Sequence, residues 1–253
     1  MRTLAVMSLI LLVLACHPPM YVRSAANSPM FTKAGEIQTT TQYGIYDFLG
    51  GKLDIQNATS FTNHIGIIAN YSSVNKKGIE STRHWLSEAG VGYYSNHNST
   101  CFEIFAGAGK GRGKNGMLQD DVPTEKIGDY NLYFIQPAFG FNKKNSHISF
   151  VSRLSLVDFK SISDGNGSTN LKPSLVLEPA IVNKINLFKK RAYFSNQIGF
   201  SMSLQSDDFR QSFFHISVGL GARVNVPSLK LKRGKALKDL PEIKQPEPEK
   251  DGN

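Results

Sequence analysis

The stretch LDIQNATSFTNHIGIIANYSSV, residues 53–74, decides the fold. Apolar and polar side chains alternate in two runs, which are separated only by residues 62–64. In the second run one face carries Ile65, Ile67, Ala69 and Tyr71, and the other carries mainly Gly66, Asn70 and Ser72. Successive side chains of a strand point to opposite faces, so this period of two predicts a β-hairpin.

The same alternation recurs to Val224 and predicts about ten strands (8–12 at the limits) in a chain of 253 residues. They are expected near residues 36–43, 51–61, 65–74, 84–95, 101–110, 130–142, 147–160, 174–183, 192–204 and 211–225. The connections after the second, fourth and sixth strands are short, whereas those after the third, fifth and seventh are longer and polar. An even strand number with short turns at one end is typical of outer-membrane barrels. The last two connections break this rule, because NKINLFKKRA after the eighth strand is long and QSDDFR after the ninth is short.

Each predicted strand has an apolar and a polar face. The apolar face includes Trp85, Val91, Tyr93, Phe102, Tyr133, Ile135, Phe139, Ile181, Ile198, Phe200, Ile216 and Val218. A soluble sandwich or a lipocalin-like barrel would bury this face, whereas a membrane barrel would turn it outward. Aromatic residues gather near strand ends and charge is concentrated in loops and on the polar face, which favours the membrane version. We therefore expect an all-β fold, an antiparallel up-and-down transmembrane β-barrel, with Trp85, Phe200 and Ile216 facing lipid and Phe134 facing the lumen.

The N-terminus carries an export signal. Residues 1–15 contain Arg2 and an apolar run, and the sequence VLAC that ends at Cys16 is similar to the lipobox of bacterial lipoproteins. We expect cleavage before Cys16 and acylation of its thiol; an ordinary cut near Ala15 or at residues 25–26 is the alternative. This predicts a signal peptide (1–15), a lipid-anchored irregular lead-in (16–35), a barrel (36–226) and a disordered periplasmic tail (227–253) rich in Lys, Glu and Pro.

Five motifs in this order resemble a family of uncharacterised bacterial outer-membrane β-barrel proteins, which often carry a lipoprotein-type signal. They are PPMYV (18–22), SPMFTKAGEIQ (28–38), LDIQNATSFTNHIGIIANYS (53–72), IQPAFGF (135–141) and LEPA (177–180). The resemblance covers most of residues 16–225 and excludes the tail. It implies a barrel in the outer membrane of a Gram-negative bacterium. It also implies partners in the barrel-assembly and lipoprotein-sorting machinery, but no catalytic or ligand-binding residues.

The polar face forms the best-defined candidate site, a lumenal polar network. Its predicted members are Glu88, Glu103, Gln136, Arg153, Glu178, Gln197 and His215. Counting outward from the loop near residue 165 places Arg153 opposite Glu178, and the loop near 206 places Gln197 opposite His215. Small barrels fill their interiors with side chains, and a buried Arg needs carboxylate partners. We expect a plugged lumen and a structural or interaction role, with a narrow pore for small solutes as the alternative and a periplasmic lipocalin-like carrier as a third.

An enzyme is not expected. A lipid A deacylase or acyltransferase would need a Ser–His pair, and although Ser81, His84 and Ser87 supply the residue types, no spacing forces a hydrogen bond between them. Cys101 is the only cysteine besides Cys16, so we expect no disulfide, no metal cluster and no cofactor.

The net charge of +9 lies largely in loops and the tail. Basic and aromatic residues do not interleave on one surface, so nucleic acid is not an expected partner. Loop lysines are suited to the anionic phosphates of outer-membrane lipid and lipopolysaccharide.

Overall fold

A computed structural model describes residues 18–47, 50–77, 81–119, 122–164, 167–205 and 209–226. The predicted signal peptide, Cys16 and the predicted tail lie outside the described residues.

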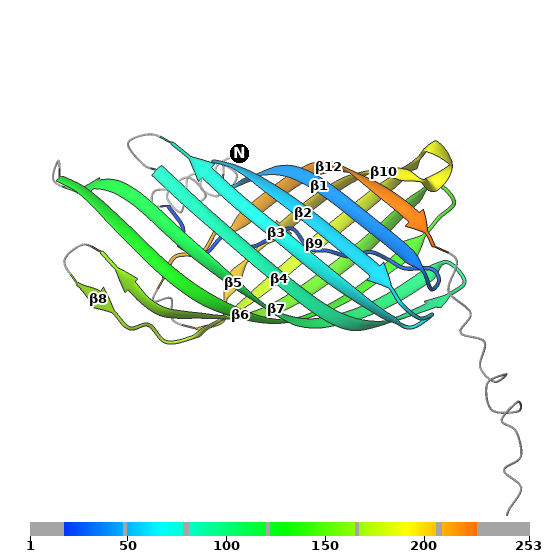
Figure 1. Ribbon diagram of the computed structural model, residues 1–253, viewed down its shortest axis with the longest axis horizontal. Coiled ribbons are helices and arrows are strands. Elements are labelled where there is room, and N and C mark those ends of the chain that lie inside the picture. The colour runs from blue at the N-terminus through cyan, green and yellow to red at the C-terminus, as the bar shows by residue number, and fades with distance from the viewer. Residues whose placement is uncertain are drawn as a thin grey trace, which may run out of the picture.

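Ten long antiparallel strands close into a barrel (Figure 1). They are β1 (Glu36–Tyr46), β2 (Gly50–Ser60), β3 (Ile65–Lys76), β4 (Ser81–His97), β5 (Thr100–Gln119), β6 (Val122–Asn142), β7 (Ser146–Ser163), β9 (Ser174–Leu187), β10 (Ala192–Phe200) and β12 (Phe214–Asn225). Each pairs with the next in the chain, and β12 pairs with β1 to close the wall. Two short strands, β8 (Ser168–Thr169) and β11 (Met202–Ser203), pair with β7 and β9. The predicted architecture and strand number are confirmed.

The two ends of the barrel differ in their connections. Residues 61–64, 98–99, 143–145 and 188–191 connect strands at the short-turn end, where β12 also finishes. Residues 47–49, 77–80, 120–121, 164–173 and 201–213 connect strands at the long-loop end. The predicted break in this alternation was wrong. Strand β9 continues to Leu187, with Lys184 on its lumenal face and Ile185 on its outward face, and the 3-10 helix Phe188–Lys190 then makes a short turn. Strand β10 ends at Phe200, which leaves a long connection to β12.

The loop predicted after the fifth strand is instead a continuation of the hairpin. Strands β5 and β6 have 20 and 21 residues, about twice the roughly 10 residues that cross a bilayer. Arg112 lies directly opposite Asp129, and its Nε and Nη2 donate to the two carboxylate oxygens at 2.6 and 2.7 Å. Lys114 and Glu125 add a second pair at 2.6 Å. The basic-then-acidic sequence folds back on itself, so opposite charges support the ladder beyond the apolar belt.

The apolar face points outward and the polar face inward, as predicted. The exposed fractions are 39% for Trp85, 39% for Phe200, 40% for Ile216 and 5% for Phe134. A carrier of the lipocalin type would have the reverse arrangement, so that interpretation is excluded. No helix within the described residues is long and apolar enough to cross a membrane.

The single tryptophan offers a test of the outward face. In vesicles whose phospholipid acyl chains carry bromine, we expect strong quenching of Trp85 fluorescence, because bromine quenches only on close contact. The control variant Trp85→Phe/Phe134→Trp places the indole in the lumen and should resist quenching. Equal quenching of both proteins would contradict the assignment of faces.

Candidate functional site

The lumen of the barrel is occupied by the chain's own N-terminal residues 18–35, here named the lumenal segment. At the long-loop end the backbone N–H of Met20 donates to Arg210 O at 2.7 Å, and at the short-turn end Gly35 N–H donates to Ser60 O at 2.9 Å. Every residue from Pro19 to Phe31 is buried. In Figure 1 the segment is the dark blue trace that runs inside the strands. The sequence predicted an irregular lead-in here and contained no indication that it enters the barrel.

Away from its two ends the lumenal segment makes no backbone–backbone hydrogen bond within the described residues, and wall side chains bind its carbonyl groups. The acceptors and donors are Pro19 O with Asn115 (3.0 Å), Arg23 O with Lys52 (2.8 Å), Ala25 O with Gln56 (2.8 Å), Asn27 O with Gln136 (2.9 Å), Ser28 O with Lys184 (2.8 Å), Pro29 O with Gln38 (2.7 Å) and Phe31 O with Asn96 (2.6 Å). A buried carbonyl without a partner costs about 1–3 kcal/mol. The polar side chains of the lumen therefore supply the hydrogen bonds that a neighbouring strand would supply in a sheet.

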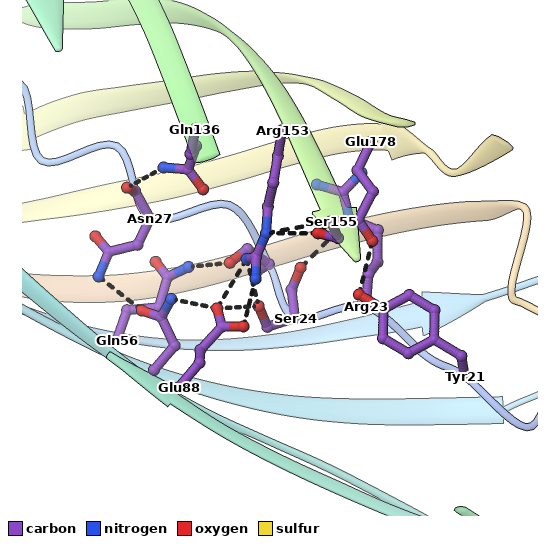
Figure 2. A network of polar contacts seen from close by, with 12 residues as sticks. Tyr21, Arg23, Ser24, Asn27, Gln56, Glu88, Gln136, Arg153, Ser155 and Glu178 are labelled. Carbon is purple, nitrogen blue, oxygen red and sulfur yellow. Dashed lines mark hydrogen bonds and ion pairs between the residues drawn. The ribbon is translucent and has the colours of Figure 1, made fainter. Parts of the chain in front are cut away.

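A buried ion cluster joins three strands near the middle of this path (Figure 2). Arg153 on β7 donates from Nη1 and Nη2 to the carboxylate of Glu88 on β4, at 2.8 and 2.5 Å. Its Nε lies 3.3 Å from Glu178 Oε2 on β9, the residue directly opposite in the ladder. The guanidinium also lies over the ring of Phe134, 4.1 Å from its centroid. One arginine thus connects both sides of the lumen.

The lumenal segment is built into this ion cluster. Tyr21 donates its hydroxyl proton to Glu178 Oε1 at 2.8 Å, and Ser24 donates to Glu88 Oε1 at 2.7 Å. Asn70 on β3 also donates to Glu88, at 2.7 Å, and accepts from Asn27 at 2.7 Å. The two carboxylates therefore share the cation Arg153, and Tyr21 and Ser24 of the segment help to orient them (Figure 2).

Two further charged groups hold the segment on either side. Asp54 on β2 pairs with Lys52 at 3.1 Å and accepts the backbone N–H of Ala25 at 3.0 Å. Glu103 on β5 accepts from the backbone N–H of Phe31 at 3.1 Å and from the Ser28 hydroxyl at 3.2 Å. Backbone N–H groups on both sides of the ion cluster are thus bound by carboxylates.

All seven residues of the predicted network are buried in the lumen. Arg153, Glu88 and Glu178 meet in the ion cluster, whereas Glu103 and Gln136 bind other parts of the lumenal segment. Gln197 Nε2 and His215 Nε2 lie 2.6 Å apart, offset by one step of the lumenal face because Gln197 pairs with Ser217 in the ladder.

Several charged wall residues of the lumen were missed, among them Lys52, Asp54, Lys184 and the buried ion pair of Glu36 with Arg223, at 3.0 Å. Lys52 and Asp54 lie on the lumenal face of β2 with Gln56, so the alternation of side chains along the strand could have identified them. Lys184 fell in a predicted loop because the end of β9 was placed too early.

Several lumen-facing glycines make room for the segment. A Cβ on Gly113 would overlap the backbone oxygen of Met20, and every nearby atom at that position belongs to Met20. A Cβ on Gly66 would lie 2.6 Å from Cε2 of Phe31, and one on Gly140 would overlap the Met30 side chain. The wall is thus hollowed along the path of the segment.

The residues considered for catalysis do not converge. His84 faces the lumen and its Nε2 lies 2.6 Å from the Tyr130 hydroxyl, whereas Ser81 and Ser87 lie on the opposite face of β4. Within the described part of the chain no group of three His, Cys, Asp or Glu side chains is placed to hold a metal ion. Cys101 is a free buried thiol.

Each mouth of the barrel contains a hollow. One of about 480 Å³ at the long-loop end is lined by Pro18, Met20, Asn115 and Phe209 among others. One of about 710 Å³ at the short-turn end is lined by Lys33, Glu36, His147 and Arg223 among others. Between these mouths lie the buried residues Tyr21 to Phe31.

No protein-family model and no curated protein matches the sequence. Among solved structures, the translocator domain of the autotransporter NalP from Neisseria meningitidis superposes with a TM-score of 0.49 at 11% identity, over 76% of this chain and 87% of that chain. The β domain of the Bordetella autotransporter BrkA gives 0.40 at 8% identity, over 76% and 99%. A loop-deletion form of OmpT, an outer membrane protein of Vibrio cholerae, gives 0.30 at 5% identity, over 75% and 98%. Similarity of this degree transfers no activity, and the barrel assignment rests on the strand pairing itself.

Because Arg153 is buried in the ion cluster and Arg112 is exposed, replacing each of them should change the free energy of unfolding by different amounts. Arg153→Met should lower the free energy of unfolding in detergent micelles by about 3–5 kcal/mol, because two carboxylates remain buried without their cation. Arg112→Met removes an equally bidentate pair that is about half exposed (52%), and should have a much smaller effect.

A triple variant, Arg153→Met/Glu88→Gln/Glu178→Gln, should regain part of the loss because neither position then keeps a buried carboxylate without Arg153. Urea titration followed by tyrosine and tryptophan fluorescence measures all three variants. Equal losses for Arg153→Met and Arg112→Met would show that the ion cluster does not carry this stability.

Proposed function

We propose that this protein is a small outer-membrane barrel whose lumen is closed to solutes by the lumenal segment, and that it has a structural or interaction role in the cell envelope. The observation that carries this proposal is the unbroken burial from Pro19 to Phe31, with wall side chains bonded to the segment along its length. A closed barrel of this kind offers its surfaces, rather than its lumen, to other molecules.

The polar groups that could line a pore are engaged elsewhere. Arg153 binds Glu88 and Glu178, and the same carboxylates accept from Ser24 and Tyr21. A conducting path would have to break charge-assisted hydrogen bonds that are among the strongest in proteins. This supports the closed lumen over the pore for small solutes.

The exterior supports the proposed location. An apolar wall with aromatic side chains such as Trp85, Tyr93 and Phe141 suits a bilayer. Beyond it, the outward side chain of Lys110 on β5 provides positive charge for lipopolysaccharide phosphates at the long-loop end. Because β12 finishes at the short-turn end, the chain after Val226 starts on what we propose to be the periplasmic side.

Conductance tests the closed lumen. In planar bilayers the native protein should give no steady single-channel current. A variant in which residues 20–31 are replaced by Gly and Ser of equal length should conduct, because the wall side chains lose their partners. Steady current through the native protein, altered by Arg153→Ala, would refute the closed lumen and favour the pore.

Lipid attachment is tested separately. Bacteria expressing the protein and fed radiolabelled palmitate should label it, and Cys16→Ser should abolish the label because the acceptor thiol is gone. Cys101→Ser is the matched control and should be labelled normally. Label that persists in Cys16→Ser would refute acylation at this residue.

A further inference from the structure

The two ends of the described chain lie at opposite mouths of the barrel (Figure 1). Val226 N–H donates to Gly35 O at 2.8 Å, which fixes the end of β12 beside the short-turn end of the lumenal segment. Pro18 lies at the other mouth, where Asn115 Nδ2 on the extended hairpin donates to its carbonyl at 3.2 Å. The chain therefore crosses the whole barrel before β1 begins.

The entry point at the long-loop end is fixed by several independent contacts. Met20 N–H donates to Arg210 O at 2.7 Å, and Ser212 N–H donates to Tyr21 O at 2.8 Å, so the connection between β10 and β12 pairs with the segment. Tyr21 and Gln211 form a parallel β-bridge. Gly113 lacks the side chain that would displace Met20. These contacts hold the chain at this mouth as far as Pro18.

We propose that the chain preceding Pro18 is presented on the outer surface of the cell, and that a lipid on Cys16 inserts into the outer leaflet of the outer membrane. This inference rests on the proposed orientation, with the short-turn end in the periplasm. The two residue steps from Cys16 to Pro18 span at most about 7 Å, whereas the hydrocarbon core of a bilayer is about 30 Å thick. A lipid attached there cannot return to the periplasmic leaflet.

The contacts of residues 18–25 also bear on where the signal is cut. Cleavage at residues 25–26 would remove Tyr21, Arg23 and Ser24 from the lumen. Glu178 would then lose the hydrogen bond from Tyr21 at 2.8 Å, and Glu88 would lose the one from Ser24 at 2.7 Å. Phe200 O would lose the hydrogen bond from the Arg23 guanidinium at 2.7 Å. The mature barrel is complete only if these residues are retained, as cleavage before Cys16 allows.

The test is an epitope tag inserted between His17 and Pro18 of the full-length protein, compared with the same tag inserted after Val226. On intact cells an antibody should bind the first tag fully, with no gain when the outer membrane is permeabilised. The second tag should stay at background until permeabilisation. Both tags should be present in whole-cell lysates.

Three results would overturn the inference. If both tags need permeabilisation, the N-terminal chain is periplasmic, while a closed lumen shown by conductance would still stand. If only the second tag is exposed, the proposed orientation of the barrel is wrong, and the inference fails with it. If the first tag is missing from lysates, the chain is cut after Pro18 and nothing is left to be presented.

Discussion

Away from its two ends, the extended segment inside the barrel has no neighbouring strand, so side chains from the wall take the place of backbone partners. Amides and lysines from six strands bind the carbonyl groups of seven residues between Pro19 and Phe31, and carboxylates bind the N–H groups of Ala25 and Phe31. An unpaired backbone group in such surroundings is costly. The lumen is polar because its side chains bind the lumenal segment, and its glycines leave the space that the segment occupies.

The charged side chains buried in the lumen depend on one another. Arg153 would be costly alone in the lumen, and Glu88 and Glu178 would be costly without it. Their remaining hydrogen-bonding capacity is taken by Tyr21, Ser24 and other polar neighbours. The wall and the segment are therefore interdependent, since neither has its polar groups satisfied without the other.

Much of the barrel wall could be predicted from the sequence, because the alternation of side chains and the outward-facing aromatic residues are visible within each strand's own stretch of sequence. The hairpin of residues 53–74, the outward face of Trp85 and the pairing of Arg153 with Glu178 all follow from alternation and counting. Residues 18–35 lack any period because their partners are side chains spread over many strands. Similarly, the extension of β5 and β6 depends on cross-strand pairs such as Arg112 with Asp129, which become visible only when the register is known.

The most direct test of the central claim is a cross-link between the lumenal segment and the wall. Asn27 and Asn70 are hydrogen-bonded at 2.7 Å, whereas Asn115 binds the segment at Pro18 and Pro19, far along the chain from Asn27. In a Cys101→Ser background, a short bis-methanethiosulfonate, which loses a sulfinate at each end as it forms two disulfides, should join Asn27→Cys to Asn70→Cys in the folded protein, and mass spectrometry should detect the linked peptides. The pair Asn27→Cys/Asn115→Cys should not be joined. Absence of the first link, or equal yields for both pairs, would contradict a segment held in this register through the lumen.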